Sequence, residues 1–141
     1  APEPPASVAA VAADSPAELY RQAFADYASG RYQRSINGFE SFLSRYPEND
    51  YAGNARYWLG ECYYSLQRYD RAAEEFGKLV ERDAQGGKTP DALLKMASAL
   101  LQADRPEQAT MALQALRERY PESAAARRAL EHSEFSNILS E

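Results

Sequence analysis

The amino-acid sequence predicts an all-α protein built as an array of stacked helical hairpins. A pattern of apolar and aromatic residues returns every 37 residues, and residues typical of helix ends stand where the units begin. No stretch shows the sustained alternation that would indicate a strand. The 141 residues include 26 Ala and 10 Tyr but only 23 Leu, Ile, Val and Phe. With a net charge of −5 this shortage would indicate disorder, unless Ala-rich helices pack closely.

The internal repeat is the strongest of these signals. Pairs related by the 37-residue shift include Tyr20 and Tyr57, Arg31-Tyr32 and Arg68-Tyr69, Phe39 and Phe76, and Leu79 and Leu116. Each unit consists of a helix, a short turn, a second helix and a connection that contains Pro or Gly. Hairpins of this kind bury their apolar faces by stacking on their neighbours, which predicts a solenoid.

Helix-end residues support the same division. Ser15 is expected to cap a helix, with Glu18 closing a capping box three residues later. Thr89, followed by Pro90, is expected to cap a later helix in the same way. Gly30 suits a helix C-terminus because glycine enters the left-handed region without steric cost.

One kind of hairpin fits the spacing of small and large residues. Leu59, Gly60, Tyr63, Ala72 and Phe76 have the spacing of a tetratricopeptide repeat, in which small residues let two helices approach closely. Small residues at the close contacts are expected to be Ala23, Gly60, Ala97, Ser35, Ala72 and Ala109. Large apolar residues between them are expected to be Phe39, Phe42, Phe76, Leu79, Leu113 and Leu116.

The predicted architecture is a right-handed tetratricopeptide-repeat superhelix of three helical hairpins plus a C-terminal capping helix. Repeats are placed at about 16–49, 53–86 and 90–123, and the capping helix at 124–139. Residues 1–14 are rich in Ala and Pro without a period, and are expected to be a flexible linker before a domain that spans 15–141. We have no interpretation of the last residues, Glu134 to Glu141.

The sequence offers no convergent reactive groups, so we predict a protein that is not an enzyme and that needs no metal or cofactor. His132 is the single histidine and is expected to lie at the surface. Cys62 is the single cysteine and is expected to be a buried structural thiol. An acidic balance disfavours nucleic acid as a partner, and no apolar run is long enough to span a membrane.

A binding surface is predicted on the first helices of the hairpins, which line the concave side of a tetratricopeptide array. The predicted groove residues are Tyr20, Phe24, Tyr27, Asn54, Tyr57, Trp58, Glu61, Tyr64, Asp91, Leu94, Lys95, Ser98 and Leu101. Aromatic side chains of this kind suit protein recognition because they combine contact area with a polar atom. The alternative is that much of this stripe packs between repeats, and Trp58 is the residue for which this is most expected.

Two segments resemble a known family. Asn54–Glu61 (NARYWLGE) and Lys88–Lys95 (KTPDALLK) are similar to runs found in the Tol-Pal system protein YbgF, or CpoB, family. Tyr46-Pro47 and the segment Tyr120–Ser123 also match, and the similarity covers about residues 18–130. The coiled coil by which the family oligomerises is absent from this sequence.

The resemblance implies a periplasmic, non-enzymatic protein. Family members bind TolA, act with a bifunctional penicillin-binding protein, and help coordinate peptidoglycan synthesis with outer-membrane constriction during division. Two alternatives remain open at this point. One is a scaffold for outer-membrane protein assembly, which has similar repeats. The other is a module that self-associates into a homo-oligomer.

Overall fold

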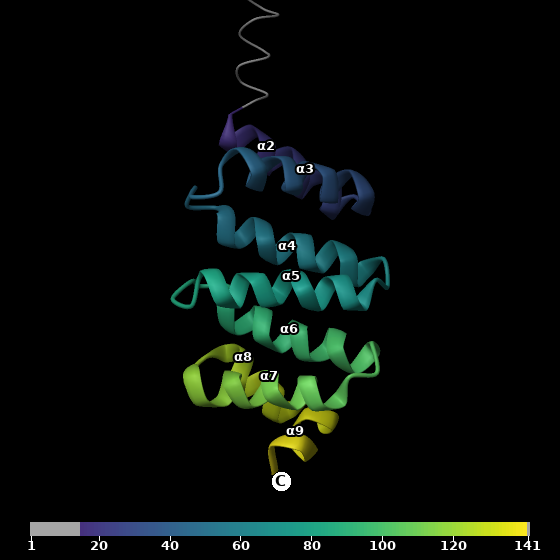
Figure 1. Cartoon of the computed structure of the whole chain (residues 1–141), viewed down its shortest axis with the longest axis vertical. Helices are drawn as coiled ribbons and strands as arrows, with labels where there is room; N and C mark the ends of the chain where they lie inside the picture. Colours follow the sequence, from purple (N-terminus) through teal and green to yellow (C-terminus); the bar gives the residue numbers. More distant parts are fainter. Residues whose placement is uncertain (1–14, 141) are drawn as a thin grey trace, which may run out of the picture.

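The computed structural model describes residues 15–140, without the side chain of Ser133, and consists of consecutive helices in this range (Figure 1). They are α2 (Pro16–Ala28), α3 (Tyr32–Arg45), α4 (Ala52–Ser65), α5 (Tyr69–Arg82), α6 (Thr89–Gln102), α7 (Pro106–Arg119), α8 (Ala124–Glu131) and α9 (Ser133–Ser140). The linker predicted for residues 1–14 lies outside the described residues. No strand occurs from residue 15 to residue 140.

The helices pair as antiparallel hairpins that stack along the long axis of the molecule (Figure 1). The hairpins are α2 with α3, α4 with α5, and α6 with α7. Each hairpin turn contains a residue with positive φ at the same point of the repeat: Gly30 at 77°, Gln67 at 61° and Asp104 at 59°. The left-handed turn predicted from Gly30 is therefore confirmed, and it recurs in the repeats that have no glycine there.

Small residues allow the two helices of each hairpin to touch, as predicted. Ala72 and Ala109 are fully buried on the second helices, and Ser35 is buried with its hydroxyl donating to the carbonyl of Ala23 at 2.7 Å. A Cβ added at Gly60 would lie 2.6 Å from the ring of Phe76, which is closer than side chains approach one another. Gly60 is therefore required by the position of the Phe76 ring.

Large apolar residues fill the interior between these contacts. Phe39, Phe42, Phe76, Leu79, Leu113 and Leu116 are all buried, as predicted. Ala residues provide much of the remaining core, and the partly buried tyrosines pack against it. The shortage of aliphatic residues is thus compensated by close helix contact and by aromatic rings.

Of the two helix caps predicted from the sequence, the one before α2 is confirmed and the one before α6 is wrong. The Ser15 hydroxyl accepts a hydrogen bond from the amide of Glu18 at 3.2 Å, so Ser15 caps α2. Thr89 was expected to cap α6, and this is wrong: Lys88 precedes the helix and Thr89 is its first residue. The Thr89 side chain is fully buried and donates to the carbonyl of Asp83, so it closes the preceding connection.

The C-terminal end is two helices where one helix over 124–139 was expected. Ser123 caps α8, and the backbone turns to an extended conformation at His132 before α9 begins. This break brings α9 back against α7, where Phe135 is buried and the carbonyl of Leu139 accepts a hydrogen bond from Arg117 at 2.8 Å. A straight helix could not make these contacts. Most of the uninterpreted segment therefore belongs to α9 and covers the end of the array.

Candidate functional site

The first helices of the hairpins lie on the inner side of the curved stack. The backbones of α2 and α4, of α4 and α6, and of α6 and α8 approach within 8 Å of each other. The second helices α3, α5 and α7 make no such approach to one another in the described chain. A curved stack crowds the helices on its concave side, so α2, α4 and α6 line the concave surface.

Three aromatic rings form the centre of this surface. Phe24 and Tyr27 of α2 both contact Trp58 of α4, with ring centroids 5.1 Å apart in each case. Phe24 and Tyr27 are also neighbours at 6.2 Å. Phe24 remains 38% exposed, whereas Tyr27 and Trp58 are half-buried. We call Phe24, Tyr27 and Trp58 the aromatic cluster; it joins the first two hairpins and stays open to solvent on one side.

Two further tyrosines connect the concave surface with the core. The ring of Tyr20 lies edge-on to buried Phe39 and Phe42, with centroids 5.6 Å and 5.9 Å away. Tyr57 contacts buried Phe76 at 5.7 Å and Trp58 at 5.2 Å. Both tyrosines therefore contribute to packing as well as to the surface.

Charged groups surround the aromatic rings on the α6 side. The Nζ of Lys95 lies 3.1 Å from Oε1 of Glu61, so the two side chains form an ion pair, although the geometry is not that of a hydrogen bond. The same ammonium group lies over the Tyr64 ring, 4.2 Å from its centroid. Lys88 lies over the rings of Tyr57 and Trp58, at 5.0 Å and 5.3 Å from their centroids. Such cation–π contacts hold both ammonium groups against the aromatic surface.

The tyrosine hydroxyls stay protonated far into the alkaline range. Burial raises the pKa of Tyr27 to about 12, and the negative charge of Glu61 adds to the effect. Burial also raises the pKa of Tyr57, with Glu61 and Asp91 contributing, and the pKa of Tyr64. At neutral pH these hydroxyls are uncharged, and they offer a partner hydrogen-bond donors beside an apolar ring.

The predicted groove residues all lie on α2, α4 and α6, but they are not equivalent. Those of α2 and α4 form a connected set of rings, whereas the third repeat contributes the half-buried Leu94 and Leu101 without an aromatic ring. The carboxylate of Asp91 forms an ion pair with the guanidinium of Arg128 on α8, with N and O atoms 2.5 Å apart. The arrangement is thus aromatic toward the N-terminus, and aliphatic and charged toward the C-terminus. Whether these residues bind a partner stays a prediction.

Sequence reasoning missed Tyr51 and Lys88, which stand one residue before α4 and α6. Tyr51 is 51% exposed, and its ring lies 5.2 Å from that of Tyr20. Both residues were assigned to connections, where no helical period places a side chain on a face. The 37-residue shift relates them to each other and could have identified them.

The remaining reactive groups are a buried cysteine and a histidine at the C-terminal edge of the concave surface, where His132 lines a small pocket with Tyr64, Ser98 and Leu101. Cys62 is fully buried, as expected, and burial raises its pKa to about 11. His132 is exposed and stacks on Phe135, with centroids 4.3 Å apart. Over the described part of the chain, no three His, Cys, Asp or Glu side chains come together in a way that could hold a metal ion. The described helices include none with the length and apolar character to cross a membrane.

Fold and surface together define the class: an all-helical repeat protein whose stacked hairpins present a concave aromatic face. Two family models, both described as tetratricopeptide repeat, match residues 20–87 and 91–123. The chain is therefore a tetratricopeptide-repeat protein, and arrays of this kind are typically scaffolds for protein interaction.

Solved structures agree with this fold. The Yersinia enterocolitica type III secretion translocator chaperone SycD has a TM-score of 0.70, with 22% identity over 90% of each chain. A Podosopora anserina putative kinesin light chain with TPR-like repeats has a TM-score of 0.69 and 15% identity, over 95% of this chain and 79% of that one. At these identities the two structures share the fold, and they carry no argument about function.

A relative in sequence matches part of the chain. The Pseudomonas putida protein named Cell division coordinator CpoB is 42% identical over 45 residues. The match covers 31% of this chain and 17% of the length of that relative.

Proposed function

We propose that this chain is a non-enzymatic periplasmic adaptor of the Tol-Pal system that binds TolA through its concave aromatic face. In this role it would help coordinate peptidoglycan synthesis with outer-membrane constriction during cell division, and a bifunctional penicillin-binding protein would be a second partner. The partial match to a protein named Cell division coordinator CpoB supports this proposal, as does the resemblance of the segments at 54–61 and 88–95.

The observation that carries the proposal is the aromatic cluster. Apolar rings cost free energy when they face water, yet Phe24 stays 38% exposed at the meeting point of two hairpins. The rings of Phe24 and Trp58 pack edge to face on each other, and Lys88 and Lys95 supply charge at the border of the concave aromatic surface. Buried aromatic anchors with a polar rim are the usual make-up of the energetically dominant part of a protein interface.

The test compares a truncation on the concave face with a truncation on the outer face. Phe24→Ala combined with Tyr64→Ala removes rings from the concave face, and Met111→Ala removes a 67% exposed side chain from the outer helix α7. The double variant should weaken TolA binding by about 1–3 kcal/mol in calorimetric titration, as interface anchors do. The Met111 variant should bind like the unchanged protein.

Thermal melting of the same variants separates binding from packing. The proposal expects the double variant to lose affinity while it stays folded at the titration temperature. Unchanged affinity in the folded double variant would contradict it.

A further inference from the structure

A second feature lies on the other side of α4, where a charged side chain occupies an apolar position. The 37-residue period makes Leu19, Arg56 and Leu93 equivalent. Leu93 is buried and Leu19 packs against the core, so Arg56 places a guanidinium at a site that the other repeats fill with an aliphatic side chain. Arg56 is half-buried. A charge in such surroundings is costly unless a counter-charge meets it.

The carboxylates around Arg56 already have partners. Glu75 is 4% exposed, and its Oε1 accepts from Arg71 at 3.2 Å and from Lys78 at 3.4 Å. Glu40 accepts a hydrogen bond from the hydroxyl of Tyr63 at 3.1 Å. The charge of Glu75 is therefore balanced by Arg71 and Lys78, and Glu40 has a neutral hydrogen-bond donor.

Arg56 and Arg82 lack such partners. Considering the described residues, neither guanidinium has a hydrogen bond or a carboxylate oxygen within ion-pair distance. Burial and the neighbouring positive charge of Arg82 lower the pKa of Arg56. The negative charges of Glu48, Glu75 and Asp83 raise this pKa, but not enough to offset these two effects.

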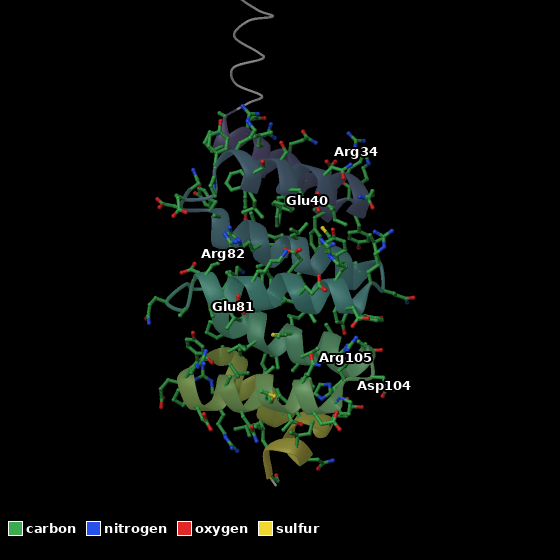
Figure 2. The ribbon with its side chains drawn as sticks, in the orientation of Figure 1. Arg34, Glu40, Glu81, Arg82, Asp104 and Arg105 are labelled. Atoms are coloured by element: carbon green, nitrogen blue, oxygen red, sulfur yellow. The ribbon has the colours of Figure 1, made fainter. Side chains whose placement is uncertain are left out.

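The two arginines line two adjoining cavities. The first, of about 260 Å³, lies between α3, α4 and α5, and Leu43 and Leu59 form part of its wall. The second, of about 440 Å³, lies beside the connection at 47–50. Figure 2 shows Glu40 on α3 and Arg82 at the C-terminal end of α5, on the side of the molecule where the second helices lie. The first cavity has a net positive lining, because Arg71 and Lys78 share it with the two arginines and with the carboxylates of Glu40 and Glu75. The second cavity is also lined by the acidic residues Glu48, Asp50 and Asp83, so a further carboxylate would fit the first cavity better.

We propose that Arg56 and Arg82 bind a carboxylate of an acidic peptide segment, on the outer side of the array between the first two hairpins. A guanidinium presents two parallel N–H groups that match the two oxygens of a carboxylate, and two guanidiniums can hold one such group from both sides. The half-buried Leu43 favours a peptide over a free inorganic anion, because its exposed part can contact an aliphatic neighbour of the acidic residue. This site does not depend on the concave face or on the function proposed for it.

The chain provides its own matched variants. Arg56→Leu installs the residue that the first and third repeats carry, so the variant should fold, with a melting temperature equal to or above that of the unchanged protein. Arg82→Gln removes the second guanidinium from the end of α5. Arg119→Gln is the control, because Arg119 is equivalent to Arg82 in the third repeat and is exposed at the end of α7.

The experiment titrates the isotope-labelled chain with the probe peptide acetyl-Leu-Glu-Leu-Glu-amide and follows the Nε–Hε signals of the arginines by nuclear magnetic resonance. We expect shifts at Arg56 and Arg82, affinity at least tenfold weaker in Arg56→Leu and in Arg82→Gln, and unchanged affinity in Arg119→Gln. The affinity should also fall with added salt.

Three outcomes would overturn the proposal. The first is equal binding of the neutral peptide acetyl-Leu-Gln-Leu-Gln-amide. The second is unchanged affinity in folded Arg56→Leu and Arg82→Gln. The third is displacement of the acidic peptide by inorganic phosphate at the same concentration, which would reveal an anion site without preference for a peptide carboxylate.

Discussion

The residues at positions related by the 37-residue period are similar inside the hairpins and different on the concave face. Inside the hairpins, equivalent positions keep one kind of residue: Phe39, Phe76 and Leu113 are all fully buried. On the concave face, equivalent positions change character, from Tyr20 and Tyr57 to Leu94, and from Phe24 to Glu61 and Ser98. The constant positions hold the array together. The variable positions are free to fit a partner, and they differ most between the second and third repeats.

The largest effect is expected inside a hairpin. Phe76→Ala removes a fully buried ring that touches Gly60 and Tyr57, and should lower the free energy of unfolding by about 3–5 kcal/mol. Urea unfolding followed by circular dichroism measures this change. Met111→Ala, on the outer face of α7, should cost less than about 0.5 kcal/mol. Similar losses in the two variants would contradict the distinction between core and surface.

A smaller effect is expected from the buried thiol. Cys62 has its pKa raised from 9.0 to about 11 by burial, so the unfolded chain loses this proton at lower pH than the folded chain. The contribution of Cys62 to stability is therefore fully present below pH 9 and is lost as the pH rises toward 11. Its size is on the order of 2 kcal/mol.

Cys62→Ala isolates this contribution. The unfolding free energy of the unchanged protein should fall more steeply between pH 9 and pH 10 than that of the variant, in urea titrations at each pH. The tyrosines remain in both proteins and contribute equally. Identical slopes would mean that the thiol is not buried as described.

The smallest effect concerns the turn that the three repeats share. Gln67 has a positive φ of 61° at the position where the first hairpin has Gly30. Gln67→Gly should raise the free energy of unfolding by about 1 kcal/mol, because glycine adopts this conformation without steric cost. The matched control Gln114→Gly, in the interior of α7, should lower it by about 0.5–1 kcal/mol. A loss of stability in both variants would show that the turn is not strained.

Periodic residues made most of the fold predictable. Residues related by the 37-residue shift make the same packing contact in each repeat, so the sequence shows each contact more than once. The shift therefore predicted the hairpins, the small residues at the helix contacts and the large residues of the core. The break at His132 could not be predicted in this way, because the helix pair after residue 123 has no second copy in the chain. Thr89 was misplaced for a similar reason: a threonine before Pro suggests a cap, and only the position of the Asp83 carbonyl shows what its hydroxyl binds.

The candidate site was predictable in part. The helical period placed the aromatic residues of α2 and α4 on one face, and the structure brings Phe24, Tyr27 and Trp58 into contact. Trp58 packs against Phe24 and Tyr27 of the first hairpin, which the sequence offered as the alternative for this residue. The contact of Tyr57 with the core ring of Phe76 was not predicted. Lys88 reaches the aromatic surface from a connection, where side-chain direction depends on the tertiary fold.

The most direct test of the concave face uses Trp58, the single tryptophan. TolA is titrated into the chain while Trp58 fluorescence and the backbone amide signals of residues 54–64 are recorded. Binding through the aromatic cluster predicts a saturable change in Trp58 emission and shifts confined to α2, α4 and the start of α6. Saturable TolA binding that leaves both the emission and these amide signals unchanged would contradict the account.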